Sequence, residues 1–287
     1  MAESATYYVP HGSRWPIFGS VSMFLLMLGA ANLMNEAAVG GPLLALGALM
    51  IVVMLFGWFG DVIRESLKGL YSDQVDVSFR QGMAWFIFSE VMFFAAFFGA
   101  LFYARHFAIP WLGGEGDGFP TNQFLWDDYA PVWPTNGPGD IGGRFETIPA
   151  WGLPLINTIL LLTSGATITA AHWALKVGKR GALIFWLAAT IALGALFLYF
   201  QAEEYMHAYS ELNLTLGSGV YGSTFFMLTG FHGMHVTLGA IMLCVILGRC
   251  IAGHFTNENH FAFEAVAWYW HFVDVVWLGL FVFVYVL

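Results

Sequence analysis

The stretch that decides the fold is AVAWYWHFVDVVWLGLFVFVYVL, residues 265–287. It is an uninterrupted apolar and aromatic segment, long enough to cross a bilayer as one helix. His271 and Asp274 lie three residues apart in it, so they share a face of that helix. Trp270 and Trp277 lie on or beside the same stripe. Because an unpaired charge is costly in hydrocarbon, we expect this face to point inward, toward helices that supply polar partners.

The composition indicates an integral membrane protein of the helical class. The 287-residue chain is 59% apolar and only 10% charged, whereas soluble domains carry about 25% charged residues. Its apolar segments are too long for the alternating strands of a membrane barrel. The net charge of −9 argues against nucleic acid as a partner. The polar N-terminal residues lead directly into the first apolar segment, so we expect no cleavable signal.

Apolar segments and turn residues predict an all-α, polytopic membrane protein with seven transmembrane helices and no internal repeat. The expected helices are 15–34, 43–67, 79–106, 153–177, 182–204, 220–250 and 265–287. Cys244 and Cys250 fall in one of these helices, six residues apart, so they cannot pair with each other. We interpret both as small buried apolar residues.

We expect one membrane domain over residues 1–287. Within it, 1–78 hold the N-terminal tail and the first two helices, and 79–287 hold the other five. A long segment, 107–148, is rich in glycine, proline and acidic residues, and it also contains three tryptophans. We therefore expect it to pack on the membrane surface or on a partner rather than to be disordered.

The basic residues predict the orientation. If the seven helices alternate, eight of the ten Lys and Arg side chains fall on one side, and only Arg105 and Arg144 fall on the other. The N-terminus is then cytoplasmic, and the C-terminus and the loop 107–148 are external. Gln201, Glu203 and Glu204 would close the fifth helix on the external side, where water can solvate them.

Three further polar side chains that could carry function fall within expected membrane segments. Glu90 lies near the middle of the third helix, so its carboxyl must be protonated or paired with a cation or a lipid headgroup. It is either a proton relay or ligand site, or a protonated side chain hydrogen-bonded to a neighbouring helix. His232 and His235 lie three apart on one helix face. They could ligate a metal or haem, but hydrogen bonds to neighbouring helices are the better interpretation.

The sequence also contains a basic cluster at the cytoplasmic ends of the second and sixth helices. Arg64, Ser66, Arg249 and His254 would lie there. Such a cluster suits an anionic phosphodiester headgroup, although it also fits the ordinary excess of basic residues on that side. No phosphate-binding glycine loop, nucleophile elbow or zinc signature occurs in the sequence.

Six motifs carry a resemblance to a known family. They are FGWFGDVIRES (56–66), FSEVMFF (88–94), LPLINT (153–158), GVYGSTFF (219–226), TGFHGMHV (229–236) and FEAVAWYWHFVDVVWL (263–278). In order and spacing they resemble subunit III of haem–copper cytochrome c oxidases of the bacterial and mitochondrial type. The resemblance covers nearly the whole chain from about residue 15, and the last motif is the most specific.

The resemblance implies a fold and a function. Helices 1 and 2 would be splayed from a bundle of helices 3–7, in a V-shaped cleft that holds phospholipids. The subunit would be non-catalytic, with haem a and copper in the partner subunits I and II, and subunit I would be the main contact. It would support proton uptake and the stability of the catalytic subunit, and cytochrome c would act on it only through the complex. The implied location is a bacterial inner membrane.

The resemblance also implies roles for individual residues. Glu90 corresponds to a buried carboxylate known to react with carbodiimide. Lipid contacts would come from Glu90 and from residues of three helices and a loop: Trp58, Arg64, Ser66, Phe86, Arg249 and His254. There are departures: the family's Trp-Ala-His-His motif is replaced by residues 170–173, AAHW, and Tyr71 stands where the family has a histidine.

Two alternatives remain open from the residues alone. The chain could be a free-standing proton-coupled transporter with Glu90, His271 and Asp274 as a relay, although repeats and broken helices, which transporters often show, are not seen. It could also be a haem or metal protein that uses His232 and His235. Within the oxidases, a subunit III of a quinol-oxidising relative also fits, because the donor site lies on another subunit.

Overall fold

The computed structural model describes residues 7–9 and 12–287, and regular structure in that part is entirely helical. The α-helices are α1 Trp15–Met34, α2 Gly40–Leu67, α3 Asp73–Tyr103, α4 Ile109–Leu112, α5 Phe119–Leu125, α6 Leu153–Lys176, α7 Arg180–Ser210, α8 Gly219–Ala252 and α9 Phe261–Leu280. Two π-helices, Ala104–Ala108 and Phe281–Val286, continue α3 and α9, and a 3₁₀-helix spans Gly116–Gly118.

Seven helical segments in the described residues are long and apolar enough to cross a membrane, which confirms the seven-helix prediction. The first has the predicted bounds. The third begins at Asp73 rather than at residue 79, because the polar residues before the apolar run continue the same helix. Proline at the first turn favours the starts of α1 and α6. Gly253, with φ +76°, ends α8 in the left-handed conformation that glycine adopts without strain.

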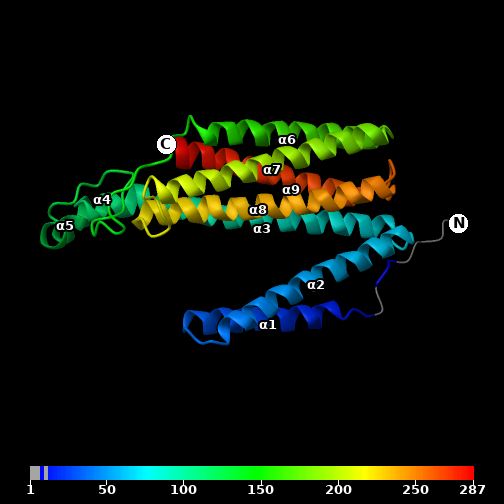
Figure 1. The fold of residues 1–287 in the computed structure, drawn as a ribbon, viewed down its shortest axis with the longest axis horizontal. Helices are drawn as coiled ribbons and strands as arrows, with labels where there is room; N and C mark the ends of the chain where they lie inside the picture. Colours follow the sequence, from blue (N-terminus) through cyan, green and yellow to red (C-terminus); the bar gives the residue numbers. More distant parts are fainter. Residues whose placement is uncertain (1–6, 10–11) are drawn as a thin grey trace. The chain divides into compact units, whose positions relative to one another are not determined.

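The chain divides into two compact units, Met1–Gln81 and Gly82–Leu287. In the first unit, α1 and α2 form an antiparallel hairpin whose backbones touch (Figure 1). A Cβ at Gly29 would lie 2.2 Å from the backbone nitrogen of Leu44, and one at Gly47 would lie 2.5 Å from that of Leu26. Small residues therefore set the distance between these helices, as in many membrane helix pairs.

In the second unit, α6, α7, α8 and α9 run side by side as a bundle (Figure 1). The part of α3 after residue 81 packs on it through aromatic side chains. Phe93 contacts Phe231 of α8 with ring centroids 5.0 Å apart, and Phe94 contacts Phe272 of α9 at 6.1 Å. The most deeply buried large side chains of this unit include Trp270 of α9. The C-terminal segment 265–287 thus provides the centre of the bundle.

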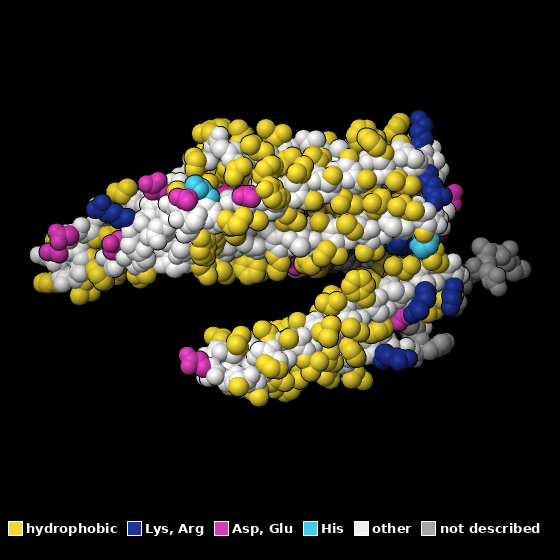
Figure 2. All heavy atoms as spheres, in the orientation of Figure 1, with side chains coloured by type: hydrophobic (Ala, Val, Ile, Leu, Met, Phe, Trp, Pro, Cys, Tyr) yellow, Lys and Arg dark blue, Asp and Glu magenta, His cyan; other side chains and the backbone are white. Residues whose placement is uncertain are grey.

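The surface of the second unit is apolar along the helices and charged at their ends (Figure 2). Lys and Arg side chains gather at the end where α6 ends and α7 begins, and most acidic side chains lie toward the other end. Lys176, Lys179 and Arg180 belong to this basic end. Apolar flanks between charged ends are what a bilayer requires of a spanning bundle.

The segment 107–148 is more ordered than a loop that only rests on a membrane surface. It contains α4, α5 and the 3₁₀-helix, and it is fixed to the bundle's own end. The Asn213 side-chain amide donates to the carbonyl oxygens of Gly142 and Arg144 at 3.0 and 2.9 Å, and Trp133 packs edge-on against Tyr221. The two hydrogen bonds satisfy the backbone carbonyls of Gly142 and Arg144, which polar composition alone could not reveal.

Candidate functional site

Trp270 and Trp277 of α9 are fully buried and hydrogen-bonded to α6. Trp270 Nε1 donates to Ser164 Oγ at 2.9 Å, and Trp277 Nε1 donates to Thr158 Oγ1 at 2.9 Å. A buried indole N–H needs a partner, because leaving it unsatisfied costs about 1–3 kcal/mol. These two hydrogen bonds fix the position of α9 along the axis of α6. They also position the polar groups that lie between the two tryptophans.

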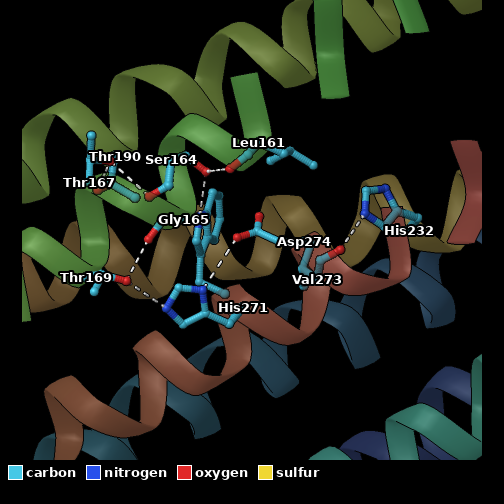
Figure 3. Close-up of polar contacts among 11 residues, drawn as sticks. Leu161, Ser164, Gly165, Thr167, Thr169, Thr190, His232, His271, Val273 and Asp274 are labelled. Atoms are coloured by element: carbon cyan, nitrogen blue, oxygen red, sulfur yellow. Dashed lines mark hydrogen bonds and ion pairs between the residues drawn. The ribbon is translucent and has the colours of Figure 1, made fainter. Parts of the chain in front are cut away.

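His271 lies between Thr169 of α6 and Asp274 of α9 (Figure 3). Its Nδ1 is 3.7 Å from Asp274 Oδ2, and its Nε2 is 3.3 Å from Thr169 Oγ1. The Thr169 hydroxyl donates to the carbonyl of Gly165 at 2.8 Å, so its oxygen accepts from His271 Nε2–H. Asp274 is interior, with 8% of its side chain exposed, whereas 44% of the His271 side chain is exposed. His271 and Asp274 therefore share one face of α9, as expected, but the imidazole of His271 extends to the bundle surface.

His232 and His235 of α8 point to different neighbours, although they are only three residues apart. His232 is completely buried, and its Nε2 lies 3.2 Å from the backbone carbonyl oxygen of Val273 in α9 (Figure 3). His235 instead faces α3, where its Nε2 lies 2.9 Å from Glu90 Oε2. The two imidazoles thus engage separate helices, and this geometry does not form a joint ligand pair.

Glu90 and His235 share one proton between Glu90 Oε2 and His235 Nε2. His235 Nδ1 is 2.6 Å from the carbonyl oxygen of Phe231, which can only accept, so Nδ1 carries a hydrogen. The contact between His235 Nε2 and Glu90 Oε2 then requires one more proton, held on either partner. Phe94 packs against the imidazole with centroids 5.0 Å apart, and the Tyr269 hydroxyl donates to the His235 carbonyl at 3.4 Å. The carboxyl is 22% exposed and borders the bundle surface.

Arg249 lies in the last turn of α8, and His254 follows the end of that helix. The guanidinium of Arg249 lies 4.4 Å above the ring of Phe255. Arg249 Nε and His254 Nδ1 are buried, and neither has a hydrogen-bond partner among residues 7–9 and 12–287. Gly253 turns the chain so that His254 N–H donates to the Arg249 carbonyl oxygen at 3.0 Å. The turn therefore holds two unsatisfied nitrogen groups close together in the chain.

The predicted lipid residues of the first unit lie in the last turns of α2. Arg64 is exposed and pairs with Asp61, which also accepts from Trp15 Nε1 at 2.7 Å. Trp58 is half-exposed and stacks on Phe59, and Ser66 is exposed. In the second unit, Phe86 is half-exposed and stacks on Tyr269 with centroids 6.2 Å apart.

Tyr71 forms its contacts inside the first unit. Its hydroxyl donates to Glu65 Oε2 at 2.8 Å, and its ring contacts Phe79 edge-on. Burial, together with the nearby Glu65 carboxylate, raises the pKa of the Tyr71 phenol. Tyr71 is therefore a neutral hydrogen-bond donor.

Comparisons with known proteins agree with this arrangement over nearly the whole chain. The sequence model of the family described as cytochrome c oxidase subunit III matches residues 5–117 and 131–287. A cytochrome c oxidase subunit 3 from Prototheca wickerhamii is 41% identical over 280 residues, which cover 97% of this chain and 96% of the relative.

This chain belongs to the cytochrome c oxidase subunit III family. The subunit 3 of Arabidopsis thaliana is 40% identical over 99% of this chain and 97% of its own length. That of Oncorhynchus clarkii is 40% identical over 99% and 98%. The chain is therefore a subunit of an oxidase complex in a membrane, which confirms the family inferred from the six motifs. Residues 118–130, which include α5, fall outside the family match.

One polar cluster of this oxidase subunit III was misjudged from the sequence. Gln201 and Glu204 of α7 were expected at a solvated rim, but both are buried, with exposures of 5% and 1%. Glu204 Oε1 accepts from the Tyr285 hydroxyl at 2.6 Å and from Gln201 Nε2 at 3.3 Å. The prediction was wrong because α7 continues to Ser210, six residues beyond the expected end. The aromatic residues that follow Glu204 were the available signal for a longer helix.

Proposed function

We propose that this chain is the non-catalytic, phospholipid-binding subunit III of a proton-pumping cytochrome c oxidase in an aerobic respiratory chain. In this role it supports proton uptake and the stability of the catalytic subunit. It packs mainly on subunit I, also contacts subunit II, and meets cytochrome c only through the complex. Haem a and copper belong to those partners. The family membership and the pairing of Glu90 with an imidazole support this assignment.

The observation that carries the lipid part of this proposal is the pair of unsatisfied nitrogen groups at the end of α8. A buried guanidinium N–H that lacks a partner costs about 1–3 kcal/mol, and a phosphodiester oxygen removes that cost. A guanidinium also suits a phosphate better than an ammonium does, because it offers several donors in one plane. Arg249 and His254 are placed at the basic end of the bundle, where the headgroup of an anionic phospholipid is accessible.

Replacing Arg249 with alanine should release an anionic phospholipid from the purified oxidase. The lost charge-assisted contacts are worth about 1.5–3 kcal/mol, so we expect about 10- to 100-fold weaker retention. Mass spectrometry of lipids that remain after repeated detergent washing measures this loss. Lys179→Ala, which removes an exposed cation at the same end of the bundle, is the matched control and should keep the lipid. Unchanged lipid content in Arg249→Ala would exclude this site.

The pairing of Glu90 with His235 supports a role in proton handling. Because one proton is shared between Oε2 and Nε2, either partner can hold it while the pair as a whole stays neutral. A carboxyl in a membrane segment is stable only under that condition. We propose that this pair is the proton-exchanging group of the subunit and that Phe94 shields it from the interior of the bundle.

Replacing Glu90 with glutamine should leave electron transfer largely intact in the assembled oxidase. The amide retains hydrogen-bonding capacity toward His235 but cannot hold the shared proton, and no redox centre depends on it. We expect cytochrome c oxidation to remain within about twofold of the wild type, equivalent to less than 1 kcal/mol in the barrier. Glu258→Gln, at an exposed loop position, serves as the control. A complete loss of activity with normal assembly and haem spectra would contradict the assignment.

The charge distribution supports a topology for the subunit. We propose that the N-terminus is cytoplasmic and that the C-terminus and residues 107–148 are external, in a bacterial inner membrane. Lys176, Lys179 and Arg180 lie together at one end of the bundle, and Asn213, which fixes the loop 107–148, lies at the opposite end of α7. The excess of basic residues marks the cytoplasmic end.

A further inference from the structure

Three ligand-type side chains meet where α6 ends and α9 begins. His172 lies one turn before the end of α6, His260 is the residue that caps α9, and Glu264 lies in the first turn of α9. One nitrogen of each histidine and one carboxylate oxygen of Glu264 all lie within 4.8 Å of one another. His260 Nε2 is 3.1 Å from Glu264 Oε1, and His172 Nε2 is 3.4 Å from the same oxygen.

The hydrogen bond behind His260 determines which of its nitrogens carries a lone pair. His260 Nδ1 lies 3.1 Å from the backbone carbonyl of Thr256, which can only accept, so Nδ1 is the protonated nitrogen. In a neutral imidazole, Nε2 then directs its lone pair at Glu264 Oε1. Two electron-rich atoms at this distance repel each other unless a positive centre lies between them. That centre is either an additional proton or a metal ion.

His172 directs a second imidazole nitrogen at the same oxygen of Glu264. In the described part of the chain, the Nε2 atoms of His172 and His260 are both buried without a hydrogen-bond partner. The two rings are edge-on, with centroids 5.6 Å apart, and both nitrogens face Glu264 Oε1. A single proton can bridge only one of the two nitrogens to the oxygen, whereas a metal ion can bind both nitrogens and the carboxylate at once.

The two nitrogen–oxygen distances are compatible with a tetrahedral ion. Ligands bound at about 2.0–2.1 Å around a tetrahedral centre are about 3.3–3.4 Å from one another. The observed 3.1 and 3.4 Å between nitrogen and oxygen are close to this spacing. Two imidazoles and one glutamate are a ligand set that Zn²⁺ uses, with a fourth position left for water. The Thr256 carbonyl that orients His260 is the outer-shell partner that such ligands require.

We propose that His172, His260 and Glu264 form a binding site for a divalent transition-metal ion of the zinc class. The ion would join the last turn of α6 to the first turn of α9 and hold the connection from Gly253 to His260 in place. We assign it a structural role, because its ligands come from two different helices. The site is separate from the Glu90–His235 pair and from the Arg249 site, and its existence does not depend on either proposal.

Zinc titration of the purified oxidase tests the site. The complex is stripped with a chelator, titrated with ZnCl₂ and analysed for bound zinc by mass spectrometry. We expect the wild type to bind about one more zinc ion per complex than His260→Gln or His172→Gln, because a structural site loses its affinity when a ligand is removed. His207→Gln, at an exposed position near the other end of α7, is the matched control and should bind zinc as the wild type does.

X-ray absorption at the zinc edge identifies the ligands of the bound ion. The zinc bound in excess over the His260→Gln complex should show nitrogen and oxygen neighbours with the scattering pattern of two imidazoles. If His260→Gln fails to assemble, the His172→Gln complex provides the same difference. Equal zinc binding by wild type and both variants would overturn the proposal. So would a wild-type complex that binds no added zinc, because the group would then be a histidinium–carboxylate cluster.

Discussion

Replacing Gly29 with valine should separate α1 from α2 and destabilise the first unit more than any exposed substitution in it. A Cβ at this position would lie 2.2 Å from the backbone nitrogen of Leu44 and 2.6 Å from its Cα. Backbone atoms cannot rotate away as a flexible side chain can, so the helices must move apart along the whole contact. Overpacking of this kind costs about 3 kcal/mol or more. Thermal denaturation of the solubilised oxidase and the amount of chain in the membrane measure the loss.

Gly41→Val is the matched control, since a Cβ at Gly41 of α2 meets nothing within 4 Å. Gly41→Val makes the same change of residue in α2, and its side chain would not touch the backbone of α1. We expect its denaturation midpoint to stay close to that of the wild type. If Gly29→Val and Gly41→Val are equally stable, the close approach of the two helices does not contribute to stability.

Trp270→Ala should be the most destabilising single substitution in the second unit. The side chain is fully buried, and its ring fits between two glycines, since a Cβ at Gly194 or Gly239 would lie 2.7 or 2.9 Å from it. Removing the ring leaves a cavity that neighbouring backbone cannot fill, at a cost of about 3–5 kcal/mol. Unfolding of the oxidase in mixed detergent micelles, followed by the loss of this subunit, measures the change.

The exposed Trp151 at the start of α6 provides the control for this experiment. Trp151→Ala removes the same ring without opening a cavity and should change stability by about 0.5 kcal/mol or less. Trp270→Phe separates the hydrogen bond from the packing, because Ser164 still donates to the Leu161 carbonyl after the indole N–H is lost. A loss in Trp270→Ala no larger than that in Trp151→Ala would show that the ring is not a packing centre.

The sequence predicted the helices well because membrane-spanning segments can be recognised by their length and hydrophobicity. The first helix was predicted at its observed bounds, and the ends of the others within about six residues. The errors occur where polar residues continue an apolar helix. Asp73 begins α3 six residues before its apolar run, and α7 carries Glu204 into the interior. Hydropathy cannot locate such ends, because a backbone continues its hydrogen bonding whatever the side chains are.

Polar pairs between helices were less accessible to sequence reasoning. Helical periodicity places His232 and His235 on one side of α8, but it does not say that one engages α9 and the other α3. The need of Glu90 for a partner was evident from its membrane depth, yet several histidines could have satisfied it. The choice of His235 depends on the rotation of α3 against α8, which aromatic packing determines. Rotations of this kind are properties of the folded bundle and leave no local pattern.

The position of α9 in the chain has a consequence for biosynthesis. Its hydrogen bonds to α6 join residues 106 and 119 positions apart, Trp270 to Ser164 and Trp277 to Thr158. While ribosomes are still translating α7 and α8, the hydroxyls of Ser164 and Thr158 therefore face lipid or other provisional neighbours. Contacts of such long sequence separation form late. The bundle of α6, α7, α8 and α9 closes only after α9 has left the insertion machinery. The nascent subunit therefore passes through an open intermediate that quality-control proteases can recognise.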